Sequence, residues 1–123
     1  MIKRAIAGVL GLGAAANGAF MLAAGRAWYE AVPGVAHTGP FNPHFVADIG
    51  AAYLAGGLAL AARSWRGRYW PAAIAGVGFF LLHAIIHAFD IAGGHSADPA
   101  VDAALVIGPA LLALWAALPN TGE

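Results

Sequence analysis

Long apolar runs separated by short polar segments make up most of this chain of 123 residues. A helix needs roughly 20 apolar residues to cross the hydrocarbon core of a bilayer. Four runs reach that length, and they cover about residues 5–24, 44–62, 70–91 and 100–118. The pattern therefore predicts an all-α fold in a single domain, a bundle of four transmembrane helices.

Residues that favour helix starts support these boundaries. Asn42 and Pro43 precede the second run, and Asp98 and Pro99 precede the fourth. Asparagine and aspartate side chains accept hydrogen bonds from the first free N–H groups of a helix, and proline is favoured at its first position. Pro109 lies inside the fourth run, where we expect it to kink the helix.

Composition agrees with a membrane protein and excludes some functions. Hydrophobic residues make up 61% of the chain and charged residues only 10%, too few to cover a water-soluble domain of this size. Six basic residues balance six acidic ones, so no net charge favours nucleic acid. The absence of cysteine excludes disulfides and thiolate metal sites.

The basic residues predict an orientation. They gather before the first run and between the second and third, as Lys3, Arg4, Arg63, Arg66 and Arg68. Because cytoplasmic loops of membrane proteins carry the excess of lysine and arginine, we expect both termini in the cytoplasm and the chain in the cell (inner) membrane. Arg26 is the one basic residue of the outer loops.

A cleaved signal peptide is the alternative for the first run. Residues 1–18 have a basic start, an apolar core and small residues near a possible cut after Gly18. The apolar run continues to Ala24, which is long for a signal core. We therefore expect the first helix to be retained.

Polar residues inside the runs fall on the predicted outer side. His44 and Asp48 share one face of the second helix, and His83, His87 and Asp90 share a face of the third, because side chains three or four residues apart stack on a helix. An isolated charge near the bilayer centre costs at least about 2.5 kcal/mol, so these side chains should satisfy one another. The two stripes predict a shared His/Asp pocket.

The remaining outer histidines lie in loops. His37 falls in the loop of residues 25–43 and His95 in the loop of residues 92–99. Loop histidines are usually solvated, so we do not expect these two to be ligands. The first loop is long enough to cover the pocket.

A transition-metal ion is the leading hypothesis for the pocket. Two histidines four residues apart can hold one ion from a single helix face, and a residue of a neighbouring helix can complete the set. The predicted ligands are His44, Asp48, His83 and His87. The predicted supporting residues around them are Asn17, Asp90 and Asp102, with Asp90 or Asp102 orienting an imidazole. Nitrogen and oxygen donors suit zinc, iron or copper.

Three alternatives stay open. The first is metal-free acid–base catalysis on a lipophilic small molecule, with His87 or His83 as the base and Asp48 or Asp90 as its partner. The second is haem b held between His44 and either His83 or His87 of the third helix. Arg26 would then be the only outer basic residue available to meet the haem propionates. The third is interhelical hydrogen bonding, within this bundle or with the partner subunits of an oligomer or larger complex.

One segment carries a resemblance. The motif N-P-H-F-x-x-D-I-G, at residues 42–50, resembles a segment of small bacterial four-helix membrane proteins that are loosely allied with the DoxX-like group. The resemblance implies a four-helix integral membrane fold. It implies no particular activity or catalytic residue.

Overall fold

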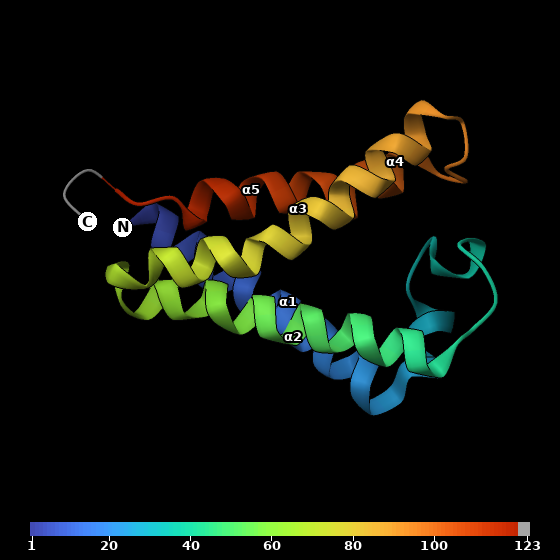
Figure 1. The fold of residues 1–123 in the computed structure, drawn as a ribbon, viewed down its shortest axis with the longest axis horizontal. Helices are drawn as coiled ribbons and strands as arrows, with labels where there is room; N and C mark the ends of the chain where they lie inside the picture. Colours follow the sequence, from blue (N-terminus) through green and yellow to red (C-terminus); the bar gives the residue numbers. More distant parts are fainter. Residues whose placement is uncertain (121–123) are drawn as a thin grey trace.

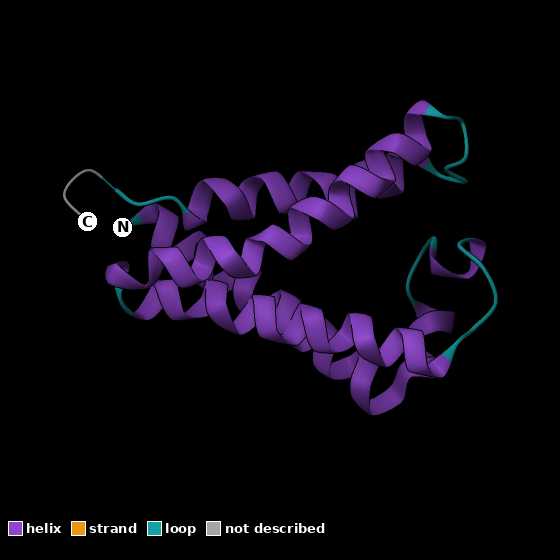
Figure 2. Cartoon of the chain, viewed as in Figure 1, coloured by secondary structure: helices purple, strands orange, loops and turns teal. Residues whose placement is uncertain are grey.

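The computed structural model describes residues 1–120, and helices are the only regular secondary structure in that range. Its elements are α1 (Ile2–Ala31), the 3₁₀ turn η1 (Val35–His37), α2 (Pro43–Trp65), the 3₁₀ turn η2 (Gly67–Tyr69), α3 (Trp70–Ala92), α4 (Pro99–Asp102), the π-helical segment η3 (Ala103–Ile107) and α5 (Gly108–Ala117). The last three are consecutive, so residues 1–120 contain four helices long and apolar enough to cross a membrane. This confirms the predicted all-α fold of four long apolar helices. Connecting loops lie only at the two ends of the bundle (Figure 2).

Both predicted helix caps are present. The Asn42 side chain accepts hydrogen bonds from the backbone N–H groups of His44 and Phe45, each at 3.1 Å. Asp98 accepts from the N–H groups of Ala100 and Val101 at the same distance. These bonds fix where α2 and α4 begin, because they satisfy N–H groups that have no partner inside the helix.

Pro109 widens the fourth helix. The N–H of Gly108 bonds to the carbonyl of Ala103, five residues back, at the end of η3. Proline has no N–H and its ring crowds the carbonyl four residues before it, so the preceding turn cannot keep regular α-helical bonds. A kink was expected at Pro109, and the structure has a π turn directly before it.

Glycines bring the first two helices into backbone contact. A Cβ added to Gly57 would lie 2.7 Å from the carbonyl oxygen of Gly11 and would also meet the backbone of Ala15. A Cβ on Gly18 would collide with the backbone of Gly50 in the same way. Small residues at seven-residue intervals on both helices thus let α1 and α2 pack more closely than side chains would allow.

The bundle has two arms that meet at one end. In Figure 1, α1 and α2 form one arm, α3 and the fourth helix form the other, and the arms separate toward the end opposite the chain termini. The core contains the buried apolar side chains of Leu60, Val77 and Phe80, and small alanines pack around them. Gly56 and Gly76 join α2 to α3, since a Cβ on either would lie within 2.9 Å of the other's carbonyl oxygen.

Arginines close the end of the bundle that holds the termini. Arg63 is fully buried and donates to the carbonyls of Ala116 at 2.8 Å, Gly67 at 2.9 Å and Leu118 at 2.7 Å. Arg4 donates to the carbonyl of Ser64 and, at 2.8 Å, to that of Trp65, at the end of α2. The last carbonyls of a helix have no partner inside it, so these two cations stabilise the ends of α5 and α2.

Candidate functional site

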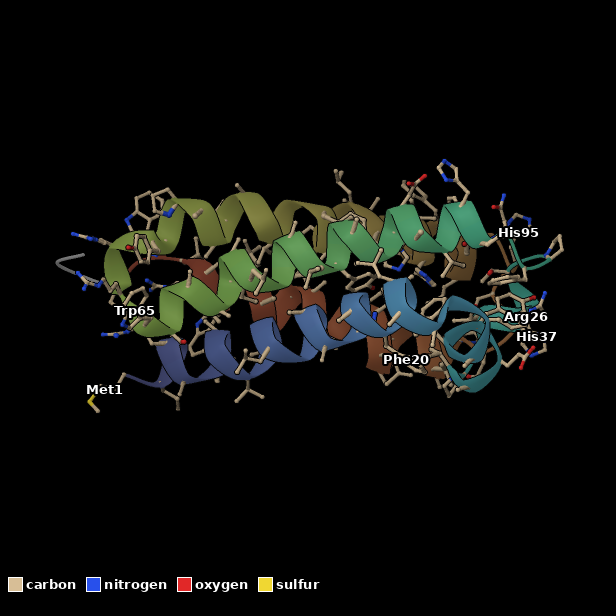
Figure 3. The ribbon with its side chains drawn as sticks, turned by 90° about the horizontal axis from the view of Figure 1, so that it is seen from below. Met1, Phe20, Arg26, His37, Trp65 and His95 are labelled. Carbon is tan, nitrogen blue, oxygen red and sulfur yellow. The ribbon has the colours of Figure 1, made fainter. Side chains whose placement is uncertain are left out.

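Polar side chains gather around a cavity of about 220 Å³ at the end opposite the termini. Three segments line it: the loop after α1, the end of α3 with the loop that follows, and the start of α4. The lining residues are Gly34, His37, Thr38, His87, Asp90, His95, Ser96, Ala97, Asp98 and Asp102. Figure 3 shows His37 and His95 at this end together with Arg26, while Met1 and Trp65 lie at the other.

His87 and Asp102 form the buried centre of this site. The imidazole Nδ1 of His87 lies 3.0 Å from Oδ1 of Asp102, and the two side chains are only 16% and 17% exposed. Nδ1 itself is buried, and the contact lacks the alignment of a hydrogen bond. It is therefore a close electrostatic contact in a setting that excludes most water, where such contacts are stronger than in solvent. Asp102 was expected to orient an imidazole; its carboxylate lies beside the imidazole of His87, and the orienting role stays a prediction.

Ser96 holds the Asp102 carboxylate from its other side. The Ser96 hydroxyl donates to Oδ2 of Asp102 at 2.6 Å. The backbone N–H groups of His95 and Ser96 both bond to the carbonyl of Asp90, at 2.8 and 3.2 Å, and so tie this loop to the end of α3. Gly94 permits the turn with a φ of 72°, which other residues rarely adopt. The loop thereby places His95 and Ser96 beside the cavity.

The carboxylates of the cavity are not equally available. Asp98 is engaged as the cap of α4, and Asp102 binds Ser96 and contacts His87. Asp90 lines the cavity at the end of α3. Asp90 is therefore the carboxylate best placed to meet a bound molecule.

His83 lies beyond the cavity lining, one helical turn before His87. Its ring centroid is 4.8 Å from that of His87 and 6.0 Å from those of Phe79 and Tyr53, with the Phe79 ring stacked nearly parallel. The imidazoles thus continue into a cluster of aromatic rings between α2 and α3. His83 therefore contacts His87 but does not line the cavity itself.

His44 and Asp48 are placed apart from the other predicted ligands. They contact each other at 3.5 Å, their side chains are 88% and 64% exposed, and neither lines the cavity. The reason is that α2 buries the face carrying Val46, Gly50 and Gly57, because its glycines meet the backbone of α1. The second helix was expected to form one side of the pocket. Residues of the loop after α1, at positions 34–38, line that cavity instead.

Asn17 also has a different environment from the one expected. Its side-chain oxygen accepts from the indole N–H of Trp28 at 2.8 Å, and its amide approaches the sulfur of Met21. The backbone between Asn17 and Trp28 is non-helical at Ala24. The Asn17 side chain therefore links the two parts of α1 across a kink.

The described residues contain no ready-made metal centre. Within residues 1–120, no group of three or more histidine, aspartate or glutamate side chains is arranged to hold an ion. The predicted set of His44, Asp48, His83 and His87 is not brought together, and the haem pairing of His44 with His87 gains no support from this placement. Metal binding stays a prediction.

Sequence reasoning missed the loop residues of the site. Ser96 had no assigned role and lines the cavity. His37 and His95 were expected to be solvated, and both are exposed, but they also line the cavity. The available signal was the gathering of all five histidines on one predicted side of the membrane. That pattern shows which end carries the site, but loop conformation decides which histidines meet.

Comparisons with family models, with curated proteins and with solved structures find no match for this chain. The resemblance to the DoxX-like group thus stays a prediction.

Proposed function

We propose that this chain is a multi-pass protein of a bacterial inner membrane, with both termini in the cytoplasm and the His/Asp cavity on the extracytoplasmic side. Four long apolar helices support the membrane assignment. Five of the six basic residues belong to the end that holds the termini, which supports the orientation. The cavity lies at the opposite end of the bundle.

In this proposal the cavity performs metal-free acid–base chemistry, with His87 as the proton-transferring group. The observation that carries it is the contact between His87 and Asp102 inside a cavity. A carboxylate beside Nδ1 favours the proton on that nitrogen and leaves Nε2 as the acceptor. Ser96 fixes the carboxylate, so Asp102 is a positioning residue. A base held by a third group in this way is a recurring arrangement in proton transfer.

The proposed ligand is a small lipophilic molecule with a polar group. A cavity of about 220 Å³ has room for the polar part of such a molecule. The aromatic side chains of Tyr53 and Phe79, which follow His83 toward the middle of the helices, offer an apolar continuation. Asp90, at the edge of the cavity, is suited to accept a hydrogen bond from the polar group.

The test uses heavy water, because the substrate is unidentified. Purified protein in detergent is incubated in heavy water with a total lipid extract of the expression host, and the extract is analysed by mass spectrometry. Wild type should add deuterium to, or convert, at least one lipid species. His87→Asn should do so at least about a hundredfold more slowly, the usual contribution of a general base.

His44→Asn is the matched control, since His44 is an exposed histidine at the same end of the bundle. It should keep wild-type activity. An extract that wild type and His87→Asn change equally, or that neither changes, contradicts the catalytic proposal and favours polar residues that only stabilise the bundle.

A transition-metal site is the second candidate, and one observation favours it: His37, His87 and His95 line the same cavity. Nitrogen ligands lie about 2 Å from a zinc, iron or copper ion, so the two loop imidazoles would have to turn toward His87. Elemental analysis of purified protein separates the candidates. Stoichiometric metal that is lost in a His37→Ala, His95→Ala variant would support the metal site, and metal-free protein that binds none on addition would exclude it.

A further inference from the structure

Two arginines at the end that holds the termini have no acidic partner among residues 1–120. Arg66 and Arg68 are exposed, and no carboxylate within the described residues 1–120 pairs with either. Their guanidinium groups lie 5.0 Å from the ring centre of Trp65 and 5.4 Å from that of Tyr69. The rings hold the arginines in place without neutralising them.

Among residues 1–120, the rest of this end carries no carboxylate side chain. The acidic residues of the described chain are Glu30, Asp48, Asp90, Asp98 and Asp102, and all follow the kink of α1, belong to the first turns of α2 or lie near the cavity. Within residues 1–120 the opposite end thus carries the carboxylate side chains, while the end with the termini carries guanidinium groups. Such a separation favours an anionic partner at the arginine end.

The helix starts show the same asymmetry. At the cavity end, α2 and α4 begin with the side-chain caps of Asn42 and Asp98. At the arginine end, α1 and α3 begin with no side-chain cap and no acidic residue in the first turn. Their first N–H groups add partial positive charge beside the arginines.

A hollow next to Trp65 completes the surface. It measures about 340 Å³ and is lined by Met1, Arg4, Ala5 and Ser64. Arg4 is fixed there by its bonds to the carbonyls of Ser64 and Trp65, made through Nε and one terminal nitrogen. Its other terminal nitrogen has no hydrogen bond among the described residues, so it can donate to a ligand.

We propose that this surface binds the headgroup of an anionic phospholipid, with Arg66 and Arg68 on the phosphate and Arg4 at the adjoining hollow. Guanidinium groups match phosphate oxygens with two parallel hydrogen bonds. Tryptophan and tyrosine at the same level suit the headgroup region of a bilayer. This inference depends only on the four membrane-spanning helices and is independent of the chemistry proposed for the cavity.

The test measures lipid binding by the full chain in phosphatidylcholine nanodiscs that contain increasing phosphatidylglycerol. Native mass spectrometry after transfer to mild detergent counts the phosphatidylglycerol molecules retained. Each basic residue near an anionic surface contributes about 1 kcal/mol, or roughly a fivefold factor. An Arg66→Gln, Arg68→Gln variant should therefore bind phosphatidylglycerol roughly thirtyfold more weakly than wild type.

Two further variants control for charge and folding. Arg26→Gln removes an arginine that is paired with Glu30 at 3.4 Å and should bind as wild type does. Arg66→Lys, Arg68→Lys keeps both charges and should retain most of the binding. If the double glutamine variant melts below wild type in pure phosphatidylcholine, the single variants are used, each with an expected fivefold loss.

Three results would overturn the proposal: wild type that retains phosphatidylglycerol no better than phosphatidylcholine, a double glutamine variant with unchanged binding, or an equal loss in Arg26→Gln. Inorganic phosphate is added as a competitor at millimolar concentration. Complete displacement of the lipid by phosphate would also count against a lipid site, because it would identify a site for the free anion.

Discussion

Arg63→Met tests the buried arginine that closes the bundle. The Arg63 side chain is fully buried and donates to the carbonyls of Ala116, Gly67 and Leu118 at 2.7 to 2.9 Å. Methionine fills a similar volume but has no N–H to donate. The substitution therefore removes these hydrogen bonds and leaves three carbonyl oxygens without this donor.

The magnitude follows from these contacts. A hydrogen bond to a charged group contributes about 1.5–3 kcal/mol in soluble proteins, while interhelical hydrogen bonds in membranes average about 0.6 kcal/mol. Methionine also avoids the cost of burying a charge, which offsets part of the loss. Taking about 1 kcal/mol for each of the three bonds, we expect Arg63→Met to lower the free energy of unfolding by about 3 kcal/mol.

The assay is reversible unfolding in mixed micelles of dodecyl sulfate and a mild detergent, followed by the fluorescence of the four tryptophans. Arg66→Met is the matched control, because it removes an exposed arginine from the same connection without breaking a hydrogen bond within the described residues. It should change the unfolding free energy by less than about 0.5 kcal/mol. Equal stability of the two variants would refute the role assigned to Arg63.

Two further predictions concern helix packing and orientation. Gly57→Ala should lower the free energy of unfolding by about 1–3 kcal/mol in the same assay, because its Cβ would lie 2.7 Å from the Gly11 carbonyl oxygen. Gly13→Ala is the control, because the Cβ there would meet open space, and it should leave stability unchanged or raise it. A larger loss of stability in Gly13→Ala than in Gly57→Ala would contradict the α1–α2 contact. Since the chain has no cysteine, His37→Cys and Arg68→Cys can each be labelled in intact cells with a membrane-impermeant maleimide. Only His37→Cys should react before the cells are opened, and labelling of Arg68→Cys alone would invert the proposed orientation.

The helices were predictable because their signals are local. Long apolar runs give the four helices, and Asn42 and Asp98 mark two starts through bonds to residues two and three positions away. Pro109 likewise predicts a distortion within its own turn. Each of these features depends on neighbours in the chain, which the sequence displays directly.

The faces of the helices were harder to predict. The stripe of His44 and Asp48 was expected to face inward because charges avoid lipid, yet it is largely exposed. Close backbone packing at Gly50 and Gly57 determines how α2 is rotated, and this depends on where α1 places its own glycines. The sequence contains both sets of glycines but does not show their register.

The composition of the site was predictable only in part. His87, Asp90 and Asp102 were identified as candidates, and they do line one cavity. His37, His95 and Ser96 reach it through two loops, whose paths depend on turns such as that at Gly94. The conformation of these loops depends on contacts with residues distant in sequence. The sequence alone therefore could not show that these three loop residues line the cavity.

The position of the proton on His87 tests the proposed acid–base pair most directly. Nitrogen-15 magnetic resonance of histidine-labelled protein, recorded at alkaline pH where imidazole is neutral, separates the two tautomers, and His87→Asn identifies the signal. We predict that Nδ1 carries the proton in wild type and in an Asp48→Asn control, and that Asp102→Asn removes this preference. A proton on Nε2 in wild type, or a tautomer that Asp102→Asn leaves unchanged, would contradict the assignment of His87 and Asp102 as the acid–base pair.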